Sequence, residues 1–194
     1  MSKTDKTKEL IIERTAEIFN TKGYIGTSLN DMTSITGLTK GSIYGNFKNK
    51  DEVAIEAFKY NLQIMNQLFS TEMAKKNTYR EKLLVYTEVL SNFSEKSLPR
   101  GGCPILNTAI ESDDTHPKLK HYAKKAFIEW KDVIVNILNK GLETGEFKAA
   151  VNAEQIAITI LATLEGAIMI RKLTDNQEYI KLAMQSLQDY INHL

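Results

Sequence analysis

Residue 37 of this 194-residue chain is a glycine that lies between two short stretches, each opened by a helix-capping residue. Ser28, followed three residues later by Asp31, is a capping pair that predicts the start of one helix. Thr39 predicts the start of a second helix in the same way. Because glycine adopts a positive φ angle at little steric cost, Gly37 suits the sharp turn between them. Together these signals predict a helix-turn-helix within residues 24–50.

Both predicted helices divide into an apolar and a polar face. Met32 and Ile35 form the apolar face of the first helix, and Ile43 and Phe47 form that of the second. Residues 38–50 hold three lysines and no acid, whereas the whole chain has a formal net charge of only +1. Basic charge concentrated in one segment favours contact with DNA phosphates through counterion release. The alternative is a solvated turn between two structural helices, which is what an isolated lysine cluster usually marks.

Small and polar side chains follow the outer face of the second helix, as in a helix that enters a DNA groove. We expect the side chains near its end to contact phosphates, namely Tyr44, Lys48 and Lys50. We expect a second group to lie near base edges or the adjacent backbone, namely Thr39, Lys40, Ser42 and Asn46. Thr27, Ser28 and Gly41 complete the candidate DNA-binding set.

The chain up to Lys50 resembles the DNA-binding domain of the TetR/AcrR family of bacterial transcriptional repressors. The residues that carry the resemblance are Ile18-Phe19, Gly23-Tyr24, Thr27-Ser28, Gly37, Thr39-Lys40-Gly41, Ile43-Tyr44, Phe47 and Lys50. The chain departs from the family pattern at Thr33 and Thr36, where alanine is usual, and at Asn46, where histidine is usual. A carbonyl four residues back could satisfy the threonine hydroxyls. The departures bear on the operator sequence rather than on DNA binding.

Helical periodicity continues through the rest of the chain, so the expected fold class is all-α with about nine helices. We expect a three-helix DNA-binding head over residues 1–48 and a ligand-binding and dimerisation body over residues 49–194. Helices are expected over residues 7–22, 49–75 and 79–97, from Cys103-Pro104, from Pro117 to Gly141 or Gly145, over residues 153–173, and from there to the C-terminus. The expected capping pairs are Asn49 with Glu52, Asn152 with Gln155, and Asp175 with Glu178.

The stretch 153–173 has apolar residues around nearly its whole circumference, so it predicts a helix buried on all sides. In a domain this small, one of those sides is expected to face a second copy of the chain. The alternative is a central core helix in a monomer. The resemblance implies a homodimer joined through the last two helices, and the candidate interface residues are Leu161, Ile168, Ile170, Leu187 and Tyr190.

The resemblance also implies a small-molecule pocket in the C-terminal body. Aromatic and polarizable side chains dominate such pockets, although each of them singly is more often plain core. Glu165 is the one acid in its apolar stretch, and burial of a carboxylate needs a reason. The candidate ligand-binding residues are Met65, Phe69, Tyr86, Phe93, Cys103, Phe127, Trp130 and Glu165.

Cys103 is the single cysteine, so no intrachain disulfide is expected. It lies at a predicted helix start near Arg100, where a cation and the helix N-terminus both favour a reactive thiolate. In an open Gly-Gly loop it could sense oxidants or electrophiles. The alternative is a small buried residue that happens to precede a helix.

No catalytic or cofactor motif stands out, so neither enzymatic activity nor a cofactor is expected. His116 and His121 are five residues apart, which does not suit metal binding on one helix face. Asp113, Asp114 and His116 are more typical of a capping turn than of an ion site. No apolar run of 18 residues is present, and the N-terminus lacks the apolar core of a signal peptide. We expect a cytoplasmic protein with no membrane span.

The expected function is that of a ligand-responsive transcriptional regulator, a repressor that a small molecule releases from a palindromic operator in double-stranded DNA. The first alternative is an α-helical enzyme or small-molecule carrier in which the helix-turn-helix is structural. The second is an activator or a nucleoid-type DNA binder. The first alternative would show no steep salt dependence of DNA binding.

Overall fold

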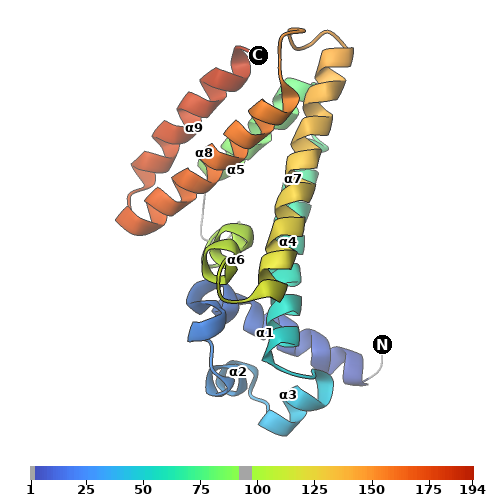
Figure 1. Ribbon diagram of the computed structural model, residues 1–194, viewed down its shortest axis with the longest axis vertical. Coiled ribbons are helices and arrows are strands. Elements are labelled where there is room, and N and C mark those ends of the chain that lie inside the picture. The colour runs from blue at the N-terminus through green and yellow to red at the C-terminus, as the bar shows by residue number, and fades with distance from the viewer. Residues whose placement is uncertain (1–2, 92–97) are drawn as a thin grey trace. The chain divides into compact units, whose positions relative to one another are not determined.

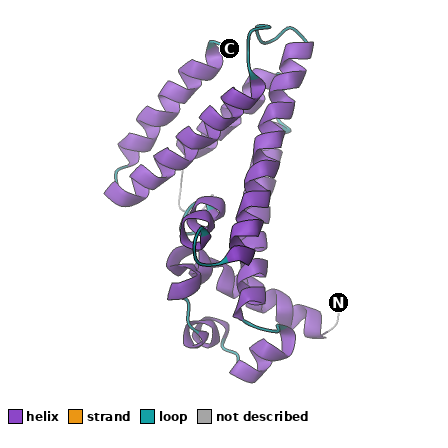
Figure 2. Ribbon diagram, in the orientation of Figure 1, coloured by secondary structure: helices purple, strands orange, loops and turns teal. Residues whose placement is uncertain are grey.

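The computed structural model describes residues 3–91 and 98–194, and in these residues it holds nine helices and no strand (Figure 2). The all-α prediction is confirmed. The helices are labelled in Figure 1 and run in order as α1 (Lys3–Gly26), α2 (Leu29–Thr36), α3 (Lys40–Asn46), α4 (Lys50–Met73), α5 (Tyr79–Ser91), α6 (Pro104–Ser112), α7 (Pro117–Glu143), α8 (Ala153–Thr174) and α9 (Gln177–Asn192).

The chain forms two compact units, and two long helices contribute to both. Unit 1 consists of Met1–Met65 and Leu98–Lys124, and unit 2 consists of Asn66–Ser97 and Lys125–Leu194. Helices α4 and α7 each begin in unit 1 and end in unit 2. This division does not coincide with the boundary expected at residue 48, because α6 and the first parts of α4 and α7 belong with the N-terminal helices.

The core of unit 1 is one apolar cluster that joins the predicted three-helix head to α4 and α7. Met32 of α2 and Ile43 of α3 are fully buried in it. The other buried members are Ile11, Ala16, Phe19, Phe47, Val53, Ala54, Ala57 and Leu119. Since Leu119 lies on α7, the head shares its core with a segment more than sixty residues away in the sequence.

In unit 2, α9 packs against both α5 and α8. The start of α5 is held by Glu146, whose carboxylate accepts the backbone N–H groups of Tyr79 (2.9 Å) and Arg80 (2.7 Å). The Arg80 guanidinium donates to the carbonyl oxygens of Ile191 and Glu146. These bonds tie two segments that are distant in sequence, around Glu146 and Ile191, to the first turn of α5.

The structure confirms two of the predicted caps on the long helices and corrects the third. Asn49 and Asn152 each accept a backbone N–H three residues ahead, as predicted. At α9, however, Asn176 accepts the Glu178 N–H at 2.9 Å. Asp175 is not the cap, because its φ of 52° places it in the left-handed conformation that ends α8.

The composition of α8 predicts a helix that is buried on all sides. Within one chain, however, part of its apolar surface stays exposed. Leu161, Ile168 and five other apolar side chains are buried, but four large ones remain 42–79% exposed. These four are Ile158, Met169, Ile170 and Leu173.

Of the described helices, none is long and apolar enough to cross a membrane.

Candidate nucleic-acid interface

The start of α2 is fixed by a complete capping box. The Ser28 hydroxyl accepts the Asp31 N–H at 3.1 Å, and the Asp31 carboxylate accepts the Ser28 N–H at 2.8 Å. Lys22 forms an ion pair with the same carboxylate at 2.6 Å. The hydrogen bonds from Lys22 and then from Ser28 hold the pKa of Asp31 well below its usual value. The capping prediction is confirmed.

The turn between α2 and α3 also has the predicted geometry. Gly37 adopts a φ of 69° and donates its N–H to the Thr33 carbonyl at 2.9 Å. The Thr39 hydroxyl then accepts the Ser42 N–H at 3.2 Å and so caps α3. The Thr36 hydroxyl donates to the carbonyl of Met32, four residues back, at 2.6 Å. The Thr33 hydroxyl donates to the Asn30 carbonyl, three rather than four residues back, at 3.0 Å. Both threonines that depart from the family pattern are therefore satisfied within their own helix.

Helix α3 turns its apolar face to the core and its polar face to solvent. Ile43 and Phe47 are buried as predicted. The prediction for α2 is only half correct, because Ile35 is 44% exposed. This eight-residue helix buries only Met32, so it contacts the core over less than a full apolar face.

Much of the candidate DNA-binding set lies at the surface. Thr39, Lys40, Gly41 and Lys48 are exposed, and Ser42 and Tyr44 are half-buried. Ser28 is exposed, but its hydroxyl is already part of the cap of α2. The charged and small residues at both ends of α3 are thus available to a duplex.

Thr27 is not available to DNA. Its side chain is fully buried, and the hydroxyl donates to the carbonyls of Gly23 at 2.7 Å and Ile18 at 3.3 Å. These bonds fix the segment that enters α2. The expectation that the Thr27 side chain contacts DNA is wrong, because this side chain is buried and both of its hydrogen bonds stay within the protein.

Two further candidates are held by the protein itself. The Asn46 amide donates to the Ser42 carbonyl at 2.8 Å on its own helix. The Lys50 ammonium lies 4.3 Å from the centre of the Tyr24 ring, and desolvation there lowers the pKa of Lys50. Contact with a duplex would require both side chains to leave these positions.

A second site lies in unit 2, where a cavity of about 210 Å³ opens among aromatic side chains. The Phe69 ring centre lies 5.0 Å from that of Tyr86 and 5.6 Å from that of Trp130. Trp130 Nε1 donates to Asn66 Oδ1 at 2.6 Å, and burial raises the pKa of Tyr86. The cavity is lined by Asn66, Phe69, Ser70, Met73, Tyr86, Glu129, Trp130 and Val133.

Three of the predicted ligand-binding residues therefore line this cavity: Phe69, Tyr86 and Trp130. Met65 is buried in unit 1, and Phe127 is half-buried on α7. Glu165 lies on the same stripe of α8 as Ile158 and Met169, at spacings of seven and four residues. Phe93 lies outside the described residues.

The sequence does hold a signal for the lining residues that were not predicted. Asn66, Ser70 and Met73 are spaced three and four residues from Phe69 or from one another, which places them on one face of α4. On α7, Val133 is three residues from Trp130 and four residues from Glu129.

Cys103 is fully buried, so the expectation of an accessible thiol is wrong. The loop before it is closed by Asn20 of α1, whose side chain donates to the carbonyls of Arg100 (2.8 Å) and Gly102 (3.0 Å). The Arg100 guanidinium forms an ion pair with Glu17 at 2.6 Å. The cation is therefore engaged by a carboxylate on α1.

The turn before α7 is a cap, as favoured from its sequence. His116 Nδ1 accepts the Leu119 N–H at 3.2 Å, and Nε2 of the same ring lies 3.4 Å from Asp51 Oδ1. Within the described residues no three histidine, cysteine, aspartate or glutamate side chains form a cluster that could hold a metal ion.

Two family models match this chain. Residues 11–57 match the model described as bacterial regulatory proteins of the tetR family, and residues 80–187 match the tetracyclin repressor-like C-terminal domain. The first match contains the helix-turn-helix, and the second contains the cavity-lining residues of α5 and α7 together with most of α8 and α9.

Similar proteins extend this match to the whole chain. A crystal structure of a TetR-family transcriptional regulator from Cytophaga hutchinsonii is 45% identical, covers 100% of this chain and 97% of its own, and has a TM-score of 0.96. The HTH-type transcriptional regulator YxaF of Bacillus subtilis is 28% identical, with 88% of this chain and 87% of that protein covered. The HTH-type transcriptional repressor DhaR of Mycobacterium sp. is 24% identical, with 88% and 85% covered. The chain belongs to the TetR family of DNA-binding transcriptional regulators.

Proposed function

We propose that this regulator is a homodimeric repressor that binds a palindromic operator and is released from it by a small molecule. The observation that carries the proposal is α3, a short capped helix with exposed Lys40 and Gly41 at its start and exposed Lys48 just beyond its end. Repression rather than activation is supported by the name of the similar protein DhaR. Since its partner is bacterial DNA, we place the protein in the cytoplasm.

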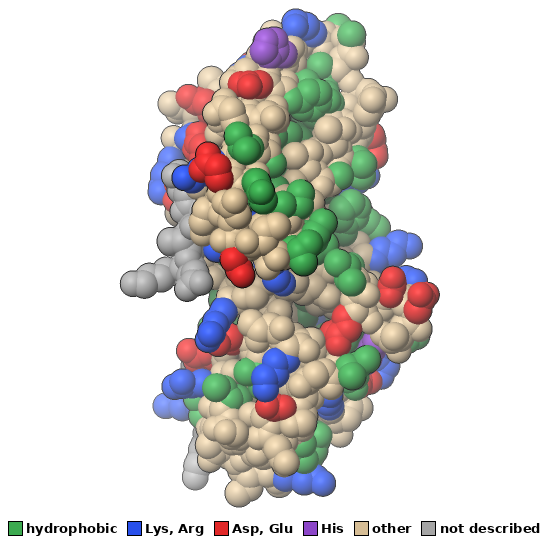
Figure 3. All heavy atoms as spheres, turned by 90° about the vertical axis from the view of Figure 1, so that its left-hand side faces the viewer, with side chains coloured by type: hydrophobic (Ala, Val, Ile, Leu, Met, Phe, Trp, Pro, Cys, Tyr) green, Lys and Arg blue, Asp and Glu red, His purple; other side chains and the backbone are tan. Residues whose placement is uncertain are grey.

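The exposed apolar side chains of α8 and α9 support the homodimer. Ile158, Met169 and Leu173 recur on one side of α8, and Tyr179, Leu182 and Tyr190 recur on one side of α9. Figure 3 shows hydrophobic side chains gathered on this side of unit 2. Two apolar stripes on neighbouring helices are the surface that a second copy would cover.

Some of the interface residues expected from sequence need revision. Leu161, Ile168 and Leu187 are buried within the single chain, so a partner could not reach them without unfolding it. Ile170 and Tyr190 stay 42% and 39% exposed and remain candidates. A two-fold axis would then set the two copies of α3 in successive major grooves, roughly 34–36 Å apart.

The cavity of unit 2 is the proposed effector site. Its aromatic walls and few polar groups are typical of small-molecule sites, and helix α4 carries both Phe69 in the cavity and Lys50 at its first residue. A ligand that shifts α4 would alter the DNA-binding end of the same helix. By linkage, DNA and ligand must then weaken each other's binding by the same factor.

The first experiment selects duplexes from a random library with the purified protein and measures their affinity against salt. We expect a dimer by sedimentation, selected sites with inverted repeats, and log K that falls linearly with log[salt]. No selection and no salt dependence would favour the alternative, an α-helical enzyme or carrier in which the helix-turn-helix is structural.

The second experiment probes the cavity with Nile red, a neutral planar dye that fluoresces in apolar surroundings. Trp130 is the only tryptophan, so energy transfer from it reports a dye bound nearby. Ser70→Phe should fill the cavity and abolish transfer, whereas Thr71→Phe, at an exposed neighbour outside the lining, should not. Equal transfer in both variants would place the dye elsewhere and contradict the proposed site.

A further inference from the structure

Helix α6 is joined to the end of α1 by polar side chains rather than by apolar contact alone. Asn20 binds the carbonyls of the loop before α6, as described above. In return, the Asn107 amide on α6 donates to the Asn20 carbonyl at 3.1 Å and to the Gly101 carbonyl at 2.9 Å. The end of α1 and the start of α6 are therefore held in one arrangement within unit 1.

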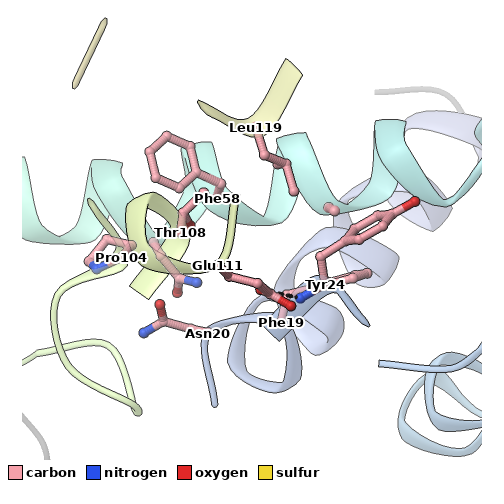
Figure 4. A pocket seen from close by; sticks show the side chains of 10 residues that line it. Phe19, Asn20, Tyr24, Phe58, Pro104, Thr108, Glu111 and Leu119 are labelled. Atoms are coloured by element: carbon pink, nitrogen blue, oxygen red, sulfur yellow. Dashed lines mark hydrogen bonds between the residues drawn. The ribbon is translucent and has the colours of Figure 1, made fainter. Parts of the chain in front are cut away.

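The most direct of these connections is made by Glu111, near the end of α6. Its carboxylate accepts the backbone N–H of Tyr24 at 2.6 Å (Figure 4). It also accepts the backbone N–H of Ile25 at 2.8 Å. Both groups follow the break at Gly23, where φ is 75° and ψ is 178°. A helix break leaves the N–H groups after it without carbonyl partners one turn back. A charged acceptor satisfies them more strongly than a neutral one.

The segment that Glu111 holds leads directly into the helix-turn-helix. Thr27 donates to the Gly23 carbonyl at 2.7 Å, and the next residue caps α2. The Tyr24 hydroxyl donates to Asp51 Oδ1 at 2.6 Å, at the start of α4. One carboxylate on α6 thus fixes the start of residues 24–28, a segment bonded to α2 through Ser28 and to α4 through Tyr24.

The surroundings of Glu111 are partly polar and not completely filled. A cavity of about 20 Å³ lies beside it and includes Asn20, Asn61 and Thr108 in its lining (Figure 4). This volume is about what one water molecule needs. The two hydrogen bonds from Glu111 therefore add to those of Asn20 and Asn107 in setting where α6 meets the end of α1.

We propose that Glu111 is a positioning residue for DNA binding: its two hydrogen bonds set the entry of the helix-turn-helix and make DNA affinity depend on the placement of α6. The inference rests on the DNA-binding function but needs neither the homodimer nor the effector. Displacement of α6 would break both bonds together and release the segment before α2. Glu111 itself lies on a different helix from every residue of the candidate DNA-binding set.

The test compares Glu111→Gln and Glu111→Ala with the wild type. A glutamine keeps the size of the side chain but offers one neutral acceptor oxygen and a donor that faces the two N–H groups. Glu17→Ala is the matched control, because it removes an exposed ion pair with Arg100 that also joins α1 to the loop before α6. Exposed pairs of this kind contribute little to stability.

The probes are duplexes selected by the wild-type protein and a random duplex, with affinity measured by fluorescence anisotropy. We expect both Glu111 variants to bind the selected duplex about tenfold more weakly, and Glu17→Ala to bind within about twofold of the wild type. Hydrogen exchange should quicken at the Tyr24 and Ile25 amides in the Glu111 variants alone. Cooperative thermal unfolding should be retained.

Wild-type affinity in both Glu111 variants would overturn the proposal. So would loss of cooperative unfolding in both, because Glu111 would then act on the whole fold rather than on the segment before α2. If the wild type itself selects no duplex, the DNA-binding function fails instead. In that case unchanged exchange at Tyr24 and Ile25 in the variants still decides against the role of Glu111.

Discussion

The carboxylate of Glu111 occupies the space in which a side chain on Gly23 would begin. A Cβ atom at residue 23 would lie 2.5 Å from Glu111 Oε2, closer than real contacts allow. The same residue has a φ of 75°, which favours glycine on its own account. The glycine that ends the regular part of α1 and the acid on α6 are thus complementary in both shape and hydrogen bonding.

This relationship predicts coupling between the two positions. Gly23→Ala should destabilise the protein through backbone strain of about 1–3 kcal/mol and through the clash with Glu111. In a Glu111→Ala background the strain remains but the clash is gone. We expect the alanine at residue 23 to cost about 1 kcal/mol less there, measured by urea unfolding of all four proteins. Equal costs in the two backgrounds would contradict the geometry.

Replacement of Lys50 is expected to change the salt dependence of DNA binding rather than the sequence preference. Its ammonium can leave the Tyr24 ring for a phosphate, so Lys50→Ala should weaken selected and random duplexes alike. The slope of log K against log[salt] should flatten by about one unit. Lys140→Ala, at an exposed lysine of α7 in unit 2, should leave the slope unchanged. A loss of preference without a change in slope would assign Lys50 to a base instead.

Replacement of Asn46 is expected to change the sequence preference of DNA binding rather than its salt dependence. Its amide is bonded only to the Ser42 carbonyl of the same helix in the part of the chain that the structure describes, so it can turn toward a base edge. Asn46→Ala should reduce the difference in binding free energy between selected and random duplex by about 1–3 kcal/mol. The slope of log K against log[salt] should stay nearly unchanged. Competition binding with the two duplexes measures the ratio, and an unchanged ratio would exclude Asn46 from base recognition.

If the apolar stripes of α8 and α9 form the dimer interface, a charged residue introduced into them should dissociate the dimer. Leu182 is 58% exposed in the single chain, so Leu182→Glu should leave each chain folded but place a carboxylate at the proposed interface. We expect helical monomers by circular dichroism and sedimentation, with weak binding to the selected duplex. Ile110→Glu, at a 64% exposed isoleucine of α6, is the control and should stay dimeric. Dimers in both variants would move the interface elsewhere.

The hydrogen bond between Tyr24 and Asp51 is expected to lose its contribution to stability both at high pH and at low pH. Burial, and then the bond to Asp51, raises the pKa of Tyr24 from 10.0 to about 12. The bond from Tyr24 is the main reason that the pKa of Asp51 is lowered. The Tyr24 contribution to stability is therefore complete below pH 10 and lost as the pH rises toward 12. The Asp51 contribution is complete above the usual carboxyl pKa and lost as the pH falls below it.

Absorbance of the phenolate near pH 11 measures the first effect. Asp51→Asn keeps the Tyr24 phenol but removes the carboxylate, so this tyrosine should ionise at lower pH than in the wild type. Tyr24→Phe should remove one late-ionising group, while Tyr86, whose pKa burial raises, should remain. A wild-type titration that Asp51→Asn leaves unchanged would show that the hydrogen bond does not control Tyr24.

Local backbone chemistry determined what the sequence alone could predict. Ser28, Gly37 and Thr39 each act on N–H or carbonyl groups within four residues of themselves, so their roles do not depend on the rest of the chain. The same holds for Asn49 and Asn152 at the starts of α4 and α8. The helix-turn-helix and the all-α class follow from signals of this range.

Tertiary contacts decided which side chains are available. The sequence marks Ile35, Leu161 and Cys103 by pattern, but their exposure depends on helices that are distant in sequence. Glu111 is a clear case, because the two N–H groups that it accepts precede it by 87 and 86 residues. Periodicity shows that a helix has an apolar or a charged side, whereas only the packed chain shows which group lies opposite that side.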